Sequence, residues 1–106
     1  MKWLLRALFA GLAVTMGWSA MARAGDWSEG RRIYVEVCAA CHTNGVAGAP
    51  RYGNRQEWEP RLQRSRTDIM LSVLKGKGSM PPKGGNPSVT NAQAAAATEY
   101  ILAGVR

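Results

Sequence analysis

The sequence predicts a small all-α domain of about four helices. Residues 25–106 form one stretch of 82 residues, which is enough for a single small domain. Apolar residues recur at helical spacing in several segments of this stretch, and residues that favour helix N-termini precede them. The alternating runs that indicate β-strands do not surround its two cysteines. These observations favour helices joined by loops over a mixed α/β fold.

The first 24 residues have the pattern of an export signal. Lys2 and Arg6 give a positively charged start, and an apolar run from residue 7 to 18 follows. Ala22-Arg23-Ala24 offers a small-x-small cleavage site. The apolar run is too short to favour a helix that spans a membrane, although a retained anchor is the alternative. We therefore expect residues 1–24 to be a cleaved signal peptide and residues 25–106 to be a periplasmic domain without stable membrane insertion.

The charge of the predicted domain excludes one class of function. It carries 11 Lys and Arg against 7 Asp and Glu, a net charge of about +4. The basic residues are spread along the chain, and no basic patch with interleaved aromatic residues is present. This pattern argues against nucleic-acid binding and favours a mildly basic face for protein partners.

The segment Cys38-Ala39-Ala40-Cys41-His42 is the most informative part of the chain. On a helical turn this spacing places both thiols and the imidazole on the same side. C-x-x-C-H is the pattern of c-type haem attachment, in which each cysteine forms a thioether to a vinyl group and the histidine reaches the iron. We expect one covalent haem c, bound through Cys38 and Cys41 and ligated by His42. Such a group also supplies a large apolar centre for a small domain.

Three other readings of the cysteine pair are weaker. A thioredoxin-like redox pair calls for a βαβ context, which the flanking sequence lacks. A zinc site calls for about four ligands, but the chain has only two cysteines and one histidine. A structural disulfide is the third reading.

A first helix is expected to carry this motif. Asp26 is placed to cap it, with Glu29 at the distance of a capping box. One face of the helix then presents residues spaced by three and four positions: Gly30, Ile33, Tyr34, Val37, Cys38 and Cys41. The motif therefore closes the apolar face of this helix.

A loop and two shorter helices follow the motif. Residues 43–54 are rich in Gly, Ala and Pro, which indicates a loop that folds beneath the haem. A helix is expected over residues 57–64, with Trp58 in the core and Pro60 tolerated only near its first turn. The candidate hydrogen-bond donors to the haem carboxylates are Trp58, Arg51 and Arg61. The sequence does not decide among them.

Thr67 is expected to cap the next helix, which Gly76 ends. Its buried stripe consists of Ile69, Met70, Val73 and Leu74. Met70 is thus assigned to packing.

Met80 is the best candidate for a second iron ligand. It lies in the Gly- and Pro-rich segment of residues 76–82, which has neither helical nor strand periodicity. His42 is the only histidine, so ligation by two imidazoles from one chain is excluded. With Met70 assigned to packing, Met80 is the soft donor that remains in the predicted domain.

A last helix is expected after the capping box formed by Thr90 and Gln93. One of its faces carries small and aromatic residues, namely Ala96, Ala97, Tyr100, Ile101 and Gly104. The small residues permit a close approach to the first helix.

These motifs together resemble the class I cytochromes c. Gly30, Tyr34 and Cys38 stand at the spacing of the N-terminal helix of that family. The resemblance implies that Gly30 lets the first and last helices cross closely, with Tyr100 packed near it. The expected fold is accordingly a small class I cytochrome c fold, in which about four helices wrap around one haem.

The run after the first cysteine is similar to the cytochrome c5-like branch of the family. It consists of Cys38, Cys41, His42, Gly45, Gly48, Ala49 and Pro50. The resemblance implies that the Pro50 carbonyl accepts a hydrogen bond from the second ring nitrogen of His42, which raises the basicity of the ring. One departure is that Asn86 and Val89 stand where some members carry a second cysteine pair.

The expected function is electron transfer rather than enzymatic catalysis. With His42 and Met80 on the iron, no site remains open for a substrate. We predict a single-haem carrier that acts between a respiratory membrane donor and a terminal oxidase or reductase, as a monomer or weak dimer. Lys75, Lys77 and Lys83 flank the Met80 loop and are placed to steer acidic partners. The alternatives are a haem subunit of a periplasmic dehydrogenase, or a gas-binding sensor or small peroxidase with a labile sixth ligand.

Overall fold

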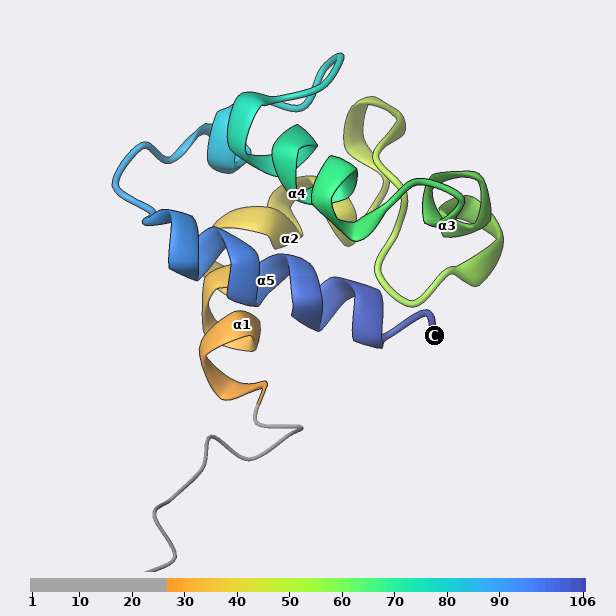
Figure 1. The fold of residues 1–106 in the computed structure, drawn as a ribbon, viewed down its shortest axis with the longest axis horizontal. Coiled ribbons are helices and arrows are strands. Elements are labelled where there is room, and N and C mark those ends of the chain that lie inside the picture. The colour runs from red at the N-terminus through yellow and green to blue at the C-terminus, as the bar shows by residue number, and fades with distance from the viewer. Residues whose placement is uncertain (1–26) are drawn as a thin grey trace, which may run out of the picture.

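A continuous helical segment opens residues 27–106, the part of the chain that the computed structural model describes (Figure 1). It consists of α1 (Ser28–Ile33), a π-helical turn (Tyr34–Cys38) and α2 (Ala39–His42). The amide of Ala39 donates to the carbonyl of Tyr34, which is the wider spacing of a π-helix. Ile33 and Tyr34 are buried, as the predicted apolar face requires. The predicted signal peptide, residues 1–24, lies outside the described residues.

The first described helix begins later than the predicted capping box implies. α1 begins at Ser28, and the side chain of its N-cap residue, Trp27, forms no capping hydrogen bond. Glu29 consequently falls on the second residue of the helix, where it forms an ion pair of 2.9 Å with Arg32. Asp26 itself lies outside the described residues.

The two middle helices exist, but their starts differ from the prediction. α3 (Arg55–Leu62) begins two residues early because the Asn54 side chain accepts a hydrogen bond of 3.2 Å from the Glu57 amide. α4 (Arg66–Lys75) is capped by Ser65, whose hydroxyl accepts from the Asp68 amide at 3.1 Å, and not by Thr67.

The early start of α3 also changes the place of Pro60. This proline lies at the sixth residue of α3, beyond the first turn to which the prediction limited it. It is exposed, and the helix ends two residues later at Leu62. The loss of one helical hydrogen bond is therefore confined to a short, solvated final turn.

The C-terminal helix α5 (Asn91–Ala103) confirms its predicted cap. The Thr90 hydroxyl accepts from the Gln93 amide at 3.1 Å, and the Gln93 side chain accepts from the Thr90 amide at 3.0 Å. α5 crosses α1 at a steep angle (Figure 1), and these two helices form the most extensive contact between elements. At the crossing, Gly30 lies directly against Ala96 and Tyr100, as the family resemblance implied.

The core consists of two clusters rather than one. The first contains Tyr34, Trp58, Ile69, Ile101, Leu102 and Val105. The second contains Ile33, Val89, Ala94 and Ala97. Cys38 packs against both, and both contribute side chains to the wall of one cavity. The apolar centre of this domain is therefore a hollow that its own side chains line but do not fill.

No strand forms within residues 27–106, where an isolated bridge joins Lys77 and Met80. The all-α prediction is confirmed for this part of the chain. None of the helices between residues 27 and 106 has the length and apolar character needed to cross a membrane.

The loop after the motif contains one unfavourable backbone conformation that can be tested. Ala47 has φ of 54°, in the left-handed region, whereas Ala49 has φ of −60° and ψ of 133°. Ala47→Gly should stabilise the protein by about 0.5 to 1 kcal/mol, because relief of the left-handed strain exceeds the entropy that glycine adds to the unfolded chain. The measurement is urea unfolding of the haem-loaded protein. Ala49→Gly is the matched control and should destabilise it, so equal destabilisation by both variants would contradict the left-handed conformation of Ala47.

Candidate cofactor site

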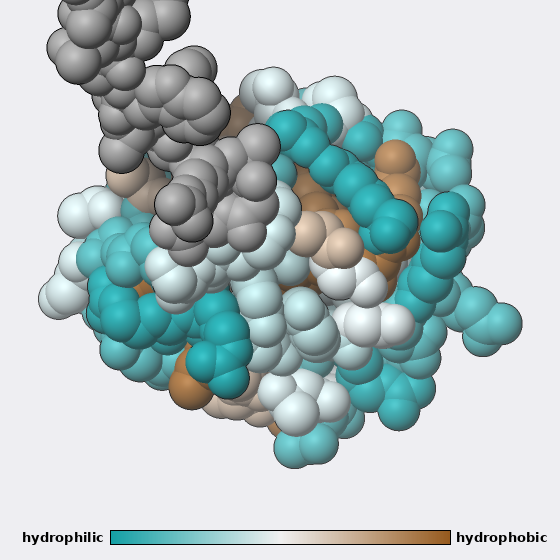
Figure 2. All heavy atoms as spheres, turned by 90° about the horizontal axis from the view of Figure 1, so that it is seen from below, coloured by the Kyte–Doolittle hydropathy of each residue, from teal (hydrophilic) through white to brown (hydrophobic). Residues whose placement is uncertain are grey.

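A cavity of about 400 Å³ lies between the two core clusters. Its wall is mainly apolar and includes side chains from α5, α4 and the segment after α4, among them Ile69, Val89, Ala97, Ile101 and Leu102. On the face shown in Figure 2, apolar surface is visible in a recess that hydrophilic side chains border. This size falls within the range of about 300–1,000 Å³ that small-molecule and cofactor sites occupy.

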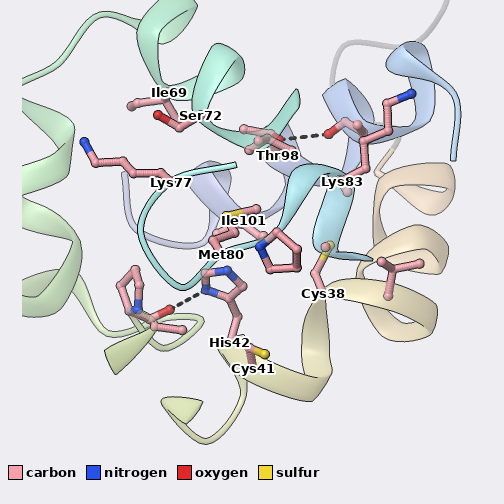
Figure 3. Close-up of a pocket in the computed structure, with 18 of the residues that line it drawn as sticks. Cys38, Cys41, His42, Ile69, Ser72, Lys77, Met80, Lys83, Thr98 and Ile101 are labelled. Atoms are coloured by element: carbon pink, nitrogen blue, oxygen red, sulfur yellow. Dashed lines mark hydrogen bonds between the residues drawn. The ribbon is translucent and has the colours of Figure 1, made fainter. Parts of the chain in front are cut away.

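The predicted attachment motif lines one side of this cavity. Cys38 ends the π-helical turn, and Cys41 and His42 lie on α2. Figure 3 shows the three side chains projecting from this segment. Both cysteines are free thiols of intermediate burial, and both line the cavity together with His42. The structure thus brings together the three residues that the sequence grouped.

His42 is held from three directions. Its ring is buried, and Nδ1–H donates a hydrogen bond of 2.8 Å to the Pro50 carbonyl, as the resemblance implied. The Trp58 ring stacks on the imidazole, with centroids 5.8 Å apart. The His42 carbonyl accepts a hydrogen bond of 2.7 Å from the amide of Tyr52. Because Nδ1 carries the proton in this arrangement, the neutral ring keeps the Nε2 lone pair for a metal.

Met80 reaches the same cavity from the loop after α4. The amides and carbonyls of Lys77 and Met80 exchange two hydrogen bonds of 2.9 Å, which close a tight turn. Gly76 has φ of 83° and lies against the Met80 carbonyl and Pro82, where a Cβ atom would clash. Figure 3 shows His42 and Met80 facing the cavity from α2 and from this loop. Met80 lines the cavity, whereas Met70 on α4 is not among the lining residues.

The charged residues that line the cavity are all basic: Arg61, Arg64, Lys77 and Lys83. Arg61 donates to the Glu57 carbonyl at 2.7 Å. Arg64 donates to the Ser72 hydroxyl at 3.0 Å and to the Asp68 carbonyl at 3.1 Å. These bonds orient the two guanidinium groups without neutralising them.

Of the three donors proposed for the haem carboxylates, only Arg61 brings its charge to the cavity. The Trp58 indole N–H donates to the Arg51 carbonyl at 2.9 Å. The Arg51 guanidinium pairs with Glu57 at 2.7 Å, and Arg51 does not line the cavity. Arg64 was not among the predicted donors: the sequence placed it at the end of the helix expected over residues 57–64, whereas α3 ends at Leu62 and Arg64 lies in the connection to α4.

Two of the other readings of the cysteine pair, a redox pair and a zinc site, find no support in the described residues. Burial raises the pKa of the Cys38 thiol, which is the opposite of the lowered pKa that activates redox cysteines. In residues 27–106 no group of three or more His, Cys, Asp or Glu side chains is placed to hold a metal ion. A reactive dithiol and a zinc site are therefore both disfavoured.

The residues of the cavity fit a haem. The apolar walls suit the porphyrin face, two thiols at C-x-x-C spacing suit its vinyl groups, and the basic rim suits its carboxylates. An imidazole and a thioether are the ligand types found in cytochromes c. The core also contains a cavity that its own side chains do not fill, as expected if a haem occupies it.

Comparison with known proteins agrees with this fit. The family model described as "Cytochrome C oxidase, cbb3-type, subunit III" matches residues 25–101. Cytochrome c-555 of Chlorobaculum tepidum is 35% identical over 100 residues, covering 91% of each chain. Cytochrome c5 of Ectopseudomonas mendocina is 39% identical over 54 residues, covering 49% of this chain and 62% of that one.

A solved structure has the same fold. A chain from the crystal structure of an electron transfer complex of nitrite reductase with cytochrome c matches with a TM-score of 0.69 and 39% identity. The match covers 74% of this chain and 96% of that chain. The matching family, the relatives and the C-x-x-C-H spacing all indicate one covalently bound haem c. The chain therefore belongs to the class I c-type cytochromes, with a cytochrome c5 among its relatives.

Proposed function

We propose that this protein is a periplasmic electron carrier in which His42 and Met80 are the axial ligands of a haem c bound through Cys38 and Cys41. The observation that carries the proposal is that the single histidine and one methionine face the same apolar cavity beside the two thiols. The haem, when bound, supplies reversible one-electron chemistry at its iron.

The chain's own residues favour electron transfer over catalysis. Two side-chain ligands leave no position on the iron for a substrate, and no second histidine is present in the sequence as an acid or base. The apolar wall excludes water, which favours the ferrous state because it disfavours additional charge on the iron. A methionine ligand acts in the same direction.

The partners belong to the same proposal. The signal-like residues 1–24 support export to the periplasm. The similar structure in complex with nitrite reductase supports a terminal reductase or oxidase as acceptor, with a membrane complex as donor. We propose that the protein acts as a monomer or weak dimer.

Absorption spectra of the exported protein in both oxidation states test the function. We expect a low-spin spectrum with thioether ligation, a pigment that acidified organic solvent does not extract, and slow, incomplete carbon monoxide binding to the reduced form. Rapid and complete binding at neutral pH would instead support the gas-binding class. Elution of the native protein with a much larger partner would support a dehydrogenase subunit.

The basic residues at the cavity predict a charge-dependent reaction rate. Lys77 and Lys83 line the cavity, whereas Arg55 on α3 lies in an ion pair with Glu59 at 3.7 Å. The double variant Lys77→Glu/Lys83→Glu should lower the rate of oxidation by anionic ferricyanide by about tenfold at low salt, because it reverses the local potential. The rate with a cationic cobalt complex should rise, and both differences should shrink with added salt.

Stopped-flow oxidation of the reduced protein makes this measurement. Arg55→Glu is the control, because it changes the net charge by the same amount as a single lysine reversal but away from the cavity. Its effect on both rates should be smaller than the effect of either single lysine reversal. Equal effects of Arg55→Glu and of either single lysine reversal would show that net charge, and not the position of the lysines, governs the reaction.

A further inference from the structure

Three tyrosines connect the C-terminal helix to the segment that carries His42. The Tyr52 ring stacks on Tyr100 with centroids 5.2 Å apart and an interplanar angle of 16°. Tyr34 lies 5.1 Å from Tyr52 and 5.5 Å from Tyr100, centroid to centroid. None of the three lines the cavity. We call Tyr34, Tyr52 and Tyr100 the tyrosine cluster.

Hydrogen bonds join this cluster to His42 and to the residue that follows it. The Tyr34 hydroxyl lies 3.1 Å from the hydroxyl of Thr43, the residue after His42. The Tyr52 amide donates to the His42 carbonyl at 2.7 Å. Tyr52 also follows Pro50 by two residues, and the Pro50 carbonyl accepts the hydrogen bond from His42 Nδ1. A shift of Tyr52 would therefore move the Pro50 carbonyl relative to the imidazole ring of His42.

The end of α5 determines where Tyr52 lies. A Cβ atom on Gly104 would come within 2.9 Å of Cζ and 3.0 Å of the hydroxyl of Tyr52. Gly104 has φ of −72°, a conformation open to any residue, so the ring and not the backbone requires glycine here.

We propose that Tyr52 is a positioning residue for His42: through the tyrosine cluster and Gly104, the packing of α5 sets the geometry of the hydrogen bond between His42 and Pro50 and thereby the reduction potential of the haem. This inference rests on the proposed function, in which His42 is an iron ligand. A strong hydrogen bond at Nδ1 makes the imidazole more basic and stabilises the ferric state. Weakening this bond raises the potential.

The test measures the reduction potential of the haem-loaded protein by spectroelectrochemical titration. Tyr52→Ala removes the Tyr52 ring. Gly104→Ala leaves the sequence of the loop intact but displaces the Tyr52 ring, because the added methyl group on α5 clashes with it. Both should raise the potential and speed the hydrogen exchange of His42 Nδ1–H in NMR spectra. Tyr52→Phe keeps the stacked ring and should leave both quantities close to those of the unaltered protein.

Two further variants separate positioning from stability. Ser65→Ala removes the capping hydrogen bond of α4, away from the cluster, and should lower stability without a change in potential. In the Tyr52→Ala background, Gly104→Ala should add nothing, because the ring with which it clashes is gone.

The results distinguish this inference from the function on which it rests. The positioning role of Tyr52 would be overturned if the reduction potential were unchanged in Tyr52→Ala and Gly104→Ala, or if Ser65→Ala shifted it equally. In either case the proposed low-spin ligation by His42 and Met80 would still stand. A spectrum without that ligation in the unaltered protein would overturn the proposed function itself.

Discussion

Replacing Met80 by alanine should open the haem iron to external ligands. Met80 is the thioether that lines the cavity with His42, and its loop position is set by the paired hydrogen bonds with Lys77 and by Gly76. In Met80→Ala, carbon monoxide should bind the reduced protein at least on the order of 100-fold more tightly, where each factor of ten corresponds to about 1.4 kcal/mol. The reduction potential should also fall, because methionine ligation raises it.

Carbon monoxide titration and the absorption spectrum of the same samples provide the measurement. Met70→Ala is the matched control, because Met70 is a partly buried methionine on α4 that does not line the cavity. It should keep the closed, low-spin spectrum and lose only some stability. If Met70→Ala opens the iron and Met80→Ala does not, the assignment of the two methionines is reversed.

Adding a single methyl group at Gly30 should destabilise the fold strongly. A Cβ atom there would overlap the carbonyl oxygen of Ala96 and lie only 2.8 Å from its carbonyl carbon. These are backbone atoms of α5, so no side-chain rotation relieves the clash and the two helices must separate. We expect Gly30→Ala to cost about 3 kcal/mol, at the upper end of the usual range for overpacking.

The direction of the stability change in Gly30→Ala tests the crossing of α1 and α5. In an ordinary helix interior, alanine is more stable than glycine by up to about 1 kcal/mol. Thermal unfolding of the haem-loaded protein should show a decrease of about 15 °C for Gly30→Ala, given about 4–8 °C per kcal/mol in a domain of this size. Ala92→Gly, at an exposed position of α5, reports the ordinary difference and should cost 1 kcal/mol or less. An increase in stability with Gly30→Ala would show that α1 and α5 do not cross at this residue.

The starts of the helices show where local sequence is ambiguous. Both Ser65 and Thr67 are acceptable N-caps, and in the structure Ser65 is the one that caps α4. Asn54 likewise begins α3 early enough to leave Pro60 near its end. At Thr90 the sequence contains one good cap with Gln93 three residues later, and there the prediction is confirmed. The π-helical turn at Tyr34–Cys38 has no sequence signal, because the apolar face continues through it.

The sequence by itself determined the class of fold and the class of cofactor. The cysteines and histidine of the motif are neighbours on one helical turn, and helical periodicity is likewise a property of nearby residues, so both can be recognised without tertiary contacts. Only the tertiary structure decided that Trp58 donates to Arg51, that Arg64 lines the cavity, and that Tyr52 packs on Gly104. The Tyr52–Gly104 contact joins residues far apart in the chain, and the Trp58–Arg51 bond and the inward side of Arg64 depend on how a loop and a connection fold. The physical reason is that local spacing sets which side chains share a face, whereas the partner of each face depends on how the helices pack.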